Sequence, residues 1–209
     1  MDYSKAVGQI SAIHDQLAKG EIYRGYRPVP VALSGVCGLA AAAAQSAVVP
    51  AGDARAWIVY WTGAAAVSGL VAGSETAFQY LWREPLHLRR QTHRVVAQFA
   101  PAVAAGALLA LLALVGQPAL TPYLPGLWAL SFGLGVFASR PYLPRASGWV
   151  ALYYLAAGAA LTASADAGVP GGWSIGGVFA AGQLAAAAVL YANVERTIHG
   201  DHREEDGQD

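Results

Sequence analysis

The chain has 209 residues, of which 56% are hydrophobic and only 12% are charged, and its formal net charge at pH 7 is zero. A soluble domain carries about a quarter charged residues, so the middle of this chain must be almost free of charge. The neutral total gives no electrostatic support to direct nucleic-acid binding, and a single cysteine excludes a disulfide framework, a Cys-based zinc finger and an iron–sulfur cluster.

The polar N-terminal segment, residues 1–28, predicts an amphipathic helix. One narrow helical face carries its apolar residues and one histidine: Val7, Ile10, Ile13, His14 and Leu17. Charged and amide side chains occupy the rest of the wheel, which is typical of a helix that lies along a membrane surface or docks a partner. Tyr23, Arg24 and Arg27 follow, and aromatic rings beside long cations suit the lipid headgroup layer.

Residues 29–195 contain six apolar stretches, each long enough for a membrane-spanning helix. A bilayer needs roughly 20 mostly apolar residues per helix, because each residue rises about 1.5 Å. The predicted spans are Val29–Val49, Ala56–Trp82, Val95–Gly116, Leu124–Tyr142, Ser147–Ala165 and Trp173–Glu195. Short turns connect them, and the polar tail at 196–209 is expected to be disordered.

An alanine-rich soluble bundle is the rival to a membrane protein, and its helices would each carry a charged face. Between Val95 and Ala165 the only charged residues are Arg140 and Arg145, which share one predicted loop. Helices that are apolar all round are buried or lie in lipid, and a soluble fold of this length cannot bury six of them. The sequence therefore predicts an all-α, polytopic integral membrane helix bundle with six transmembrane helices.

Basic residues set the predicted orientation, because Lys and Arg are retained on the cytoplasmic side of short loops. With six crossings and a cytoplasmic N-terminus, that side holds Lys5, Lys19, Arg24, Arg27, Arg83, Arg89, Arg90, Arg94, Arg140, Arg145, Arg196 and Arg203. Only Arg55 lies on the opposite side. Both ends of the chain are then cytoplasmic.

Small residues are the expected means of helix association, since packing leucine on leucine gains little in lipid. Alanines fill positions 40–44, and Gly172 and Gly176 have the spacing of a dimer motif. Packing within one monomer and a homo-oligomer face both fit this pattern. The chain also shows weak internal similarity, because Ala32-Leu33-Ser34 recurs as Ala129-Leu130-Ser131. Chance and an inverted three-plus-three repeat, of the kind found in transporters, both explain it.

Glu75 is the first candidate for a ligand, ion or proton site, because a carboxylate inside an apolar span is costly unless it is paired, protonated or wetted. Gln79 lies one helical turn further along. Residues of other helices complete the predicted set: Arg94, Gln98, Gln183 and Asn193. The competing interpretation is a carboxylate that simply reaches a nearby arginine or headgroup water.

No catalytic residue and no metal site are predicted, because the chain has no nucleophile–base pair, phosphate-binding loop or HExxH motif. The five histidines all fall on the predicted cytoplasmic side, where solvated surface side chains are the simplest explanation. Neutral imidazole is nevertheless the commonest metal ligand. Haem or metal binding therefore stays open, through His14, His87, His93 and His199.

The predicted cytoplasmic face is basic, and its densest stretch is 83–94. Such a stretch sets topology and attracts anionic lipid headgroups by about 1 kcal/mol per basic residue near the surface. The outer loops carry only Asp53, Arg55 and Asp166 as charges. A partner is therefore expected from the inside, and the residues that would meet it or the lipid are Tyr23, Arg24, Arg27, Arg83, Arg89, Arg90, Arg140 and Arg145.

Two parts of the chain carry a resemblance: Ile13-His14-Asp15-Gln16-Leu17 through Tyr23-Arg24-Gly25-Tyr26-Arg27, and Leu124-Pro125-Gly126-Leu127-Trp128-Ala129 through Ser139-Arg140-Pro141. The chain resembles bacterial six-helix inner-membrane proteins, a family without an assigned function, over most of its length. The resemblance implies a bacterial inner-membrane location and supplies no catalytic residue. It also implies a gene beside a small winged-helix transcription regulator, and so a cytoplasmic protein partner.

Two functions fit these features. The first is a non-enzymatic inner-membrane protein whose basic cytoplasmic face docks or senses a cytoplasmic partner. The second is a small-molecule or ion transporter built on the inverted repeat, with its site near Glu75. Membrane lipids are expected partners in either case.

Overall fold

The computed structural model describes residues 27–82 and 86–205, and the helices among them confirm the all-α prediction. Its elements are α2 (Pro28–Val48), α3 (Ala54–Trp82), α4 (Leu86–Val115), η1 (Pro118–Tyr123), α5 (Leu124–Ala138), η2 (Arg140–Tyr142), α6 (Ser147–Ala163) and α7 (Gly172–Glu205). The two η elements are short 3-10 turns. The amphipathic helix predicted within residues 1–28 falls almost wholly outside the described residues.

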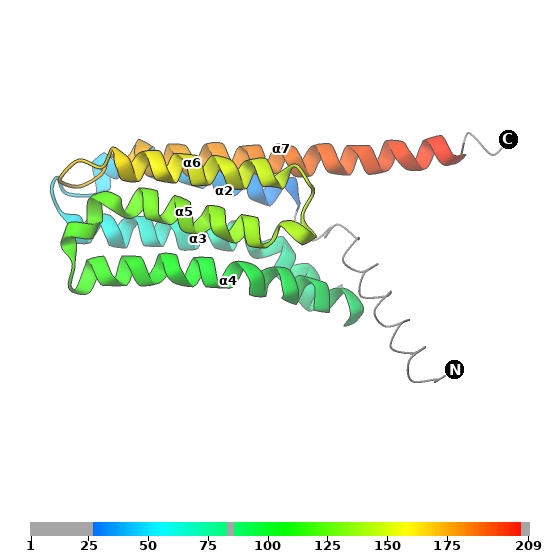
Figure 1. Cartoon of the computed structure of the whole chain (residues 1–209), viewed down its shortest axis with the longest axis horizontal. Coiled ribbons are helices and arrows are strands. Elements are labelled where there is room, and N and C mark those ends of the chain that lie inside the picture. The colour runs from blue at the N-terminus through cyan, green and yellow to red at the C-terminus, as the bar shows by residue number, and fades with distance from the viewer. Residues whose placement is uncertain (1–26, 83–85, 206–209) are drawn as a thin grey trace.

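The six long helices run up and down in chain order as one bundle (Figure 1). The α2–α3, α4–α5 and α6–α7 connections lie at one end, which we call the Asp53 end (residues 49–53, 116–123 and 164–171). The start of α2 and the α5–α6 turn lie at the other, which we call the Arg140 end (residues 27–28, 93–94 and 139–148). Helix α2 packs most extensively on α7, and α5 on α6, while α3 and α4 lie against α2 and α5.

Five segments of the described chain are long and apolar enough to cross a membrane. They are Pro28–Val48, Ala54–Ser74, His93–Val115, Pro118–Ala138 and Gly172–Asn193. Helix α6 is also apolar but has only 17 residues. The fold is therefore that of a helical membrane protein with six helices, five of which have the length of a span.

Two charged segments, which the sequence predicts to be a loop and a disordered tail, are helical over most of their length. Helix α4 begins at Leu86, so that most of the basic stretch 83–94 is helix and not loop. Pro85 precedes the first helical residue, and no glycine or proline follows it before Pro101, which favours an early start. At the other end of the chain, α7 continues to Glu205 through the first ten residues of the segment 196–209 that is expected to be disordered.

The fourth predicted span is shorter as an α-helix than the apolar run suggests. Helix α5 ends at Ala138, and residues 140–142 form the 3-10 turn η2. Pro141 cannot continue the helix, because it lacks an amide hydrogen and restricts the residue before it. The 3-10 turn η1 extends the same apolar segment at its other end, so that Pro118–Ala138 together reaches the length of a span.

Glycines let the most closely packed helices approach each other. A Cβ built on Gly176 would lie 2.5 Å from the carbonyl oxygen of Gly38, and one built on Gly172 would lie 2.6 Å from that of Ala42. Small residues at these positions allow backbone-to-backbone packing of α2 and α7. The Gly172/Gly176 pair, for which a dimer face was one expectation, therefore faces another helix of the same chain.

Candidate functional site

A cluster of aromatic rings joins four helices of the bundle. The ring centroid of Phe132 on α5 lies 5.1 Å from Phe99, 4.8 Å from Tyr154 and 5.5 Å from Phe179, which belong to α4, α6 and α7. The Tyr154 hydroxyl donates a hydrogen bond to the Phe179 carbonyl oxygen at 3.1 Å. Gly182 leaves room for the Tyr154 ring, because a Cβ there would collide with it. These rings pack α4, α5, α6 and α7 against one another.

A second cluster, the Gln45 network, closes the Asp53 end of the bundle and consists of Gln45, Trp57, Trp61 and Pro170. The Gln45 Oε1 atom accepts hydrogen bonds from the indole N–H of Trp57 at 3.1 Å and of Trp61 at 2.6 Å. The Gln45 Nε2 atom donates to the Pro170 carbonyl oxygen at 3.1 Å, and Trp57 also donates to that oxygen at 2.9 Å. Trp57 stacks on Trp128 with 5° between the ring planes. The network ties α2, α3 and the α6–α7 connection together.

The Gln45 network is absent from the sequence-based predictions. Gln45 follows a run of alanines, and in the sequence it looks like an ordinary polar residue that a helix tolerates. The signal that could have found it is the pair Trp57 and Trp61, because indoles one helical turn apart present two N–H donors to the same neighbour. Its polar atoms bond to one another, which is typical of a structural cluster.

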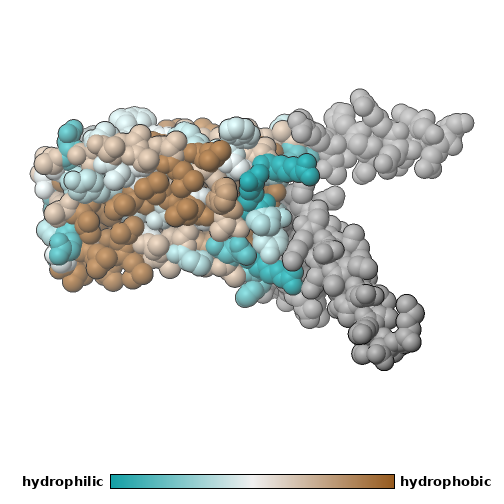
Figure 2. Space-filling model, in the orientation of Figure 1, coloured by the Kyte–Doolittle hydropathy of each residue, from teal (hydrophilic) through white to brown (hydrophobic). Residues whose placement is uncertain are grey.

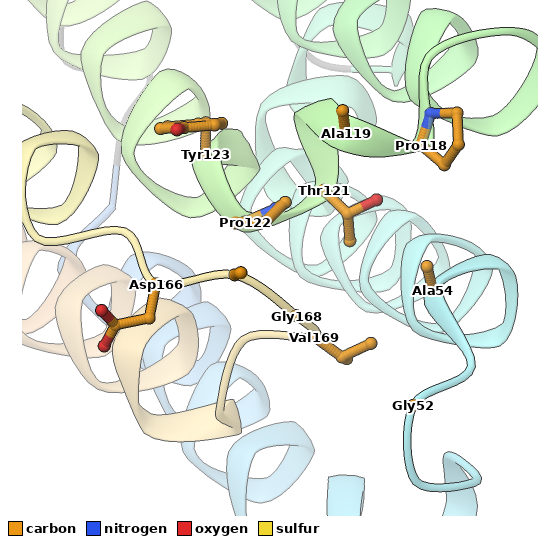
Figure 3. Close-up of a pocket in the computed structure, with 11 residues that line it drawn as sticks. Gly52, Ala54, Pro118, Ala119, Thr121, Pro122, Tyr123, Asp166, Gly168 and Val169 are labelled. Carbon is orange, nitrogen blue, oxygen red and sulfur yellow. The ribbon is translucent and has the colours of Figure 1, made fainter.

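A pocket of about 350 Å³ opens at the Asp53 end between the start of α3, η1 and the α6–α7 connection (Figure 3). Thr121 lies toward Ala54 and Val169, whereas the Asp166 carboxylate turns away from Thr121. The remaining lining is largely glycine, alanine and proline. The polar side chains that line the pocket therefore diverge, and they form no ligand-binding constellation.

The packing of α2 on α3 fixes the depth of Glu75. The Tyr60 hydroxyl donates to the Ala41 carbonyl oxygen at 2.6 Å, which sets the register of the two antiparallel helices. Both helices rise by about 1.5 Å per residue, so Glu75 comes about level with Pro28, where α2 begins. The backbone thus carries Glu75 to the Arg140 end of the bundle, while the side chains of Glu75 and Gln79 lie outside the described ones.

The other four residues of the predicted ligand site lie on α4 and α7. Gln98 is exposed on the flank formed by α4. Gln183 is half-buried in the α2–α7 contact, where its Cβ lies 3.1 Å from a Cβ built on Gly35. Arg94 is exposed and Asn193 half-buried, and each has an interaction partner. With Glu75 and Gln79 on α3, the predicted set is therefore spread over three helices.

The Arg140 end carries the exposed arginines of the described chain except Arg55. Three of the predicted contact residues are exposed there, Arg27, Arg140 and Arg145, together with Arg94 of the predicted ligand site. Of the others, Arg89 and Arg90 lie in the first turns of α4, with side chains outside the described ones, and Tyr23, Arg24 and Arg83 lie outside the described residues. Figure 2 shows hydrophilic residues gathered near this end, beside a hydrophobic surface that covers much of the bundle.

Within the described side chains, no group of three or more His, Cys, Asp or Glu is placed to hold a metal ion. Among the four histidines named for haem or metal, only His93 has a described side chain, and it is exposed. His87 and His199 are known by their helical backbone alone, and His14 lies outside the described residues. Haem or metal binding through these histidines therefore stays an open prediction.

Two buried hydroxyls, those of Thr121 and Ser139, have no hydrogen-bond partner in the described part of the chain. We expect Thr121→Val and Ser139→Ala each to raise the free energy of unfolding by about 1 kcal/mol, since an unsatisfied buried polar group is costly. Chemical denaturation in detergent measures the change. Ser164→Ala, at an exposed position, is the control, and a loss of stability in either test variant would contradict the assignment.

Comparison with known proteins adds no relative. No protein-family model matches the chain, and neither a curated protein nor a solved structure matches it. The fold and the composition define the class on physical grounds alone: a helical membrane protein with a basic end and a less charged opposite end.

Proposed function

We propose that all six helices cross the membrane, including the short α6. Gly148 in the first turn of α6 contacts Arg140, and Thr162 near its last turn contacts Gly126 at the start of α5. Helix α6 therefore runs from the Arg140 end to the Asp53 end (Figure 1). Its 17 residues are at the lower limit of a spanning helix, which is about 17–25 residues.

Exposed tryptophans at both ends of the bundle support this embedding. Trp149, near the start of α6, is 75% exposed, and Trp173, at the start of α7, is 63% exposed. Indole rings collect at the two membrane–water interfaces, where one edge is apolar and the other is wet. The concentration of arginines supports an Arg140 end that faces the cytoplasm. The expected location is the bacterial inner membrane, with both chain ends inside.

We further propose that the protein is non-enzymatic and that its basic cytoplasmic face docks or senses a cytoplasmic partner. The observation that carries this proposal is the charge difference between the ends of the bundle. Arg27, Arg94, Arg140 and Arg145 are exposed at one end, whereas the other has Arg55 beside two exposed carboxylates. Such a face attracts an acidic surface electrostatically. The resemblance favours a small winged-helix regulator as the partner.

The experiment is a pull-down from the organism's own cytosol with the purified full-length protein. We expect one or more proteins to be retained, and to be lost when Arg89 and Arg90 are both changed to Glu or when residues 1–27 are removed. Arg55→Glu, which changes the same kind of charge at the opposite end, is the matched control. Identical profiles from the parent and the two basic-face variants would contradict the proposal.

A transporter with its site near Glu75 is the second candidate. In its favour, α7 packs on α2 as α4 packs on α5, which is the neighbour relation that an inverted three-plus-three repeat needs. Against it stands the spread of the predicted site residues over three helices, with Arg94 and Gln98 both exposed. Uptake by proteoliposomes that is lost in Glu75→Gln and kept in Gln117→Leu, an exposed position outside the predicted site, would favour transport over docking.

A further inference from the structure

Arg140 lies in a notch between the last turn of α5 and the first turn of α6. A Cβ built on Gly148 would be 3.2 Å from the Arg140 Nε atom and 3.5 Å from its Cζ atom. On the α5 side, the Cζ atom lies 5.9 Å from the centre of the Phe137 ring. Because Gly148 has no side chain, the guanidinium can lie against its backbone, in space that a larger side chain would occupy. Arg140 as a whole remains exposed.

The corner that holds Arg140 has an excess of positive charge. Helices α4, α5 and α6 and the turn η2 contain no acidic residue, so none of these elements can supply a carboxylate. The start of α6 adds the positive end of a helix dipole. Arg145, five residues further along the same turn, is exposed and adds a second cation. The positive charge of this corner attracts an anion.

Apolar rings beside Arg140 set the level of the corner in the membrane. Trp149 directly follows Gly148 and is 75% exposed, and Phe137 is also exposed. Aromatic rings at the end of an apolar helix lie at the level of the lipid headgroups. A guanidinium at this level meets the phosphate groups of the surrounding lipids before it meets bulk water.

We propose that Arg140, seated on Gly148 and assisted by Arg145, binds the phosphate of an anionic phospholipid. The inference rests on the proposed membrane crossing and not on the protein partner. The amides of Ser147 and Gly148 already donate to the carbonyl oxygens of Pro144 and Arg145, so the guanidinium is the binding group. Its planar fork donates two hydrogen bonds to one phosphate, which an ammonium group cannot reproduce in the same geometry.

The test is native mass spectrometry of the full-length protein released from nanodiscs that contain phosphatidylcholine and phosphatidylglycerol in equal amounts. We expect the parent to retain phosphatidylglycerol preferentially. Arg140→Gln should reduce that preference by about fivefold, the effect of one basic residue near an anionic surface. Arg140→Lys should recover only part of it. Arg55→Gln, which removes a cation at the opposite end, should leave it unchanged.

Gly148→Leu distinguishes the effect of the Arg140 position from the effect of the positive charge. It keeps both arginines but fills the notch, so the preference should fall although the net charge is the same. Gly148→Ala is the milder variant if the leucine variant melts at a lower temperature, because the three atoms nearest to a new Cβ all belong to the flexible Arg140 side chain. A preference unchanged in both Arg140→Gln and the notch variant would overturn the inference.

Two further arms identify the source of the phosphate and separate the two proposals. Excess inorganic phosphate should leave the bound phosphatidylglycerol in place, and its displacement would overturn the assignment to a lipid. Failure of the parent to enter nanodiscs would contradict the proposed membrane crossing. Entry without a lipid preference would contradict the lipid site alone.

Discussion

Replacing Gly176 with valine is expected to lower the free energy of unfolding by roughly 3 kcal/mol or more. A Cβ at this position would lie 2.5 Å from the Gly38 carbonyl oxygen and 2.7 Å from the Ala42 Cβ. The first of these atoms belongs to the backbone of α2 and cannot move alone. Helices α2 and α7 must therefore separate, and the packing that holds the first and last helices together is lost.

Gly69→Val is the matched control for this prediction. Gly69 also lies inside a long helix, but apart from its chain neighbours and the backbone of its own helix, no atom lies within 4 Å of a Cβ built on it. The change in helix propensity is the same in both variants, so the difference between them measures the α2–α7 contact. Unfolding followed by circular dichroism in one detergent provides the comparison. Equal stability of the two variants would contradict the close packing.

Gln45→Leu is expected to cost about 2–4 kcal/mol, because it removes one acceptor shared by two indole groups. Trp57 keeps its hydrogen bond to the Pro170 carbonyl oxygen. Trp61, which is 3% exposed, loses the hydrogen bond that its indole N–H donates to Gln45. A buried N–H without an acceptor carries its full desolvation penalty. The connection between α6 and α7 is expected to loosen as well, since Gln45 also holds Pro170.

Gln117→Leu controls for the loss of an amide at the same end of the bundle, because Gln117 is exposed. Thermal unfolding gives the stability, and tryptophan fluorescence reports on the surroundings of Trp57 and Trp61. We expect a lower melting temperature and an altered emission maximum for Gln45→Leu alone. If the two glutamine variants behave alike, the hydrogen bonds of the Gln45 network do not stabilise the bundle.

The number and order of the helices follow from the sequence because continuous apolar runs need no tertiary information. The precise ends do not follow, since local chemistry competes with apolarity there. Pro141 ends an α-helix inside an apolar stretch, and Pro118 and Pro122 favour a 3-10 turn before α5. The basic residues after Pro85 form helix because arginine and leucine have high helix propensities.

The candidate sites depend on tertiary contacts and were harder to predict. The apolar run from Ala56 to Trp82 predicts one span, with Glu75 some two turns before the basic stretch and therefore near the cytoplasmic end of the bundle. The register of α3 against α2 carries the backbone of Glu75 to the Arg140 end, because α3 is longer than α2. Likewise, nothing in the local sequence reveals that Gly148 makes room for Arg140, since the contact joins two helices across a turn.

Cysteine labelling on either side of α6 tests the proposed membrane crossing most directly. Arg145 and Ala167 are both exposed, and they lie just before and just after this short helix in the chain. Each is replaced by cysteine in a chain whose own Cys37 is changed to alanine, and a membrane-impermeant maleimide is applied to intact cells and to inverted vesicles. We predict that position 167 is labelled in cells and position 145 only in inverted vesicles. Labelling of both positions from the same side would contradict a six-span bundle with both ends in the cytoplasm.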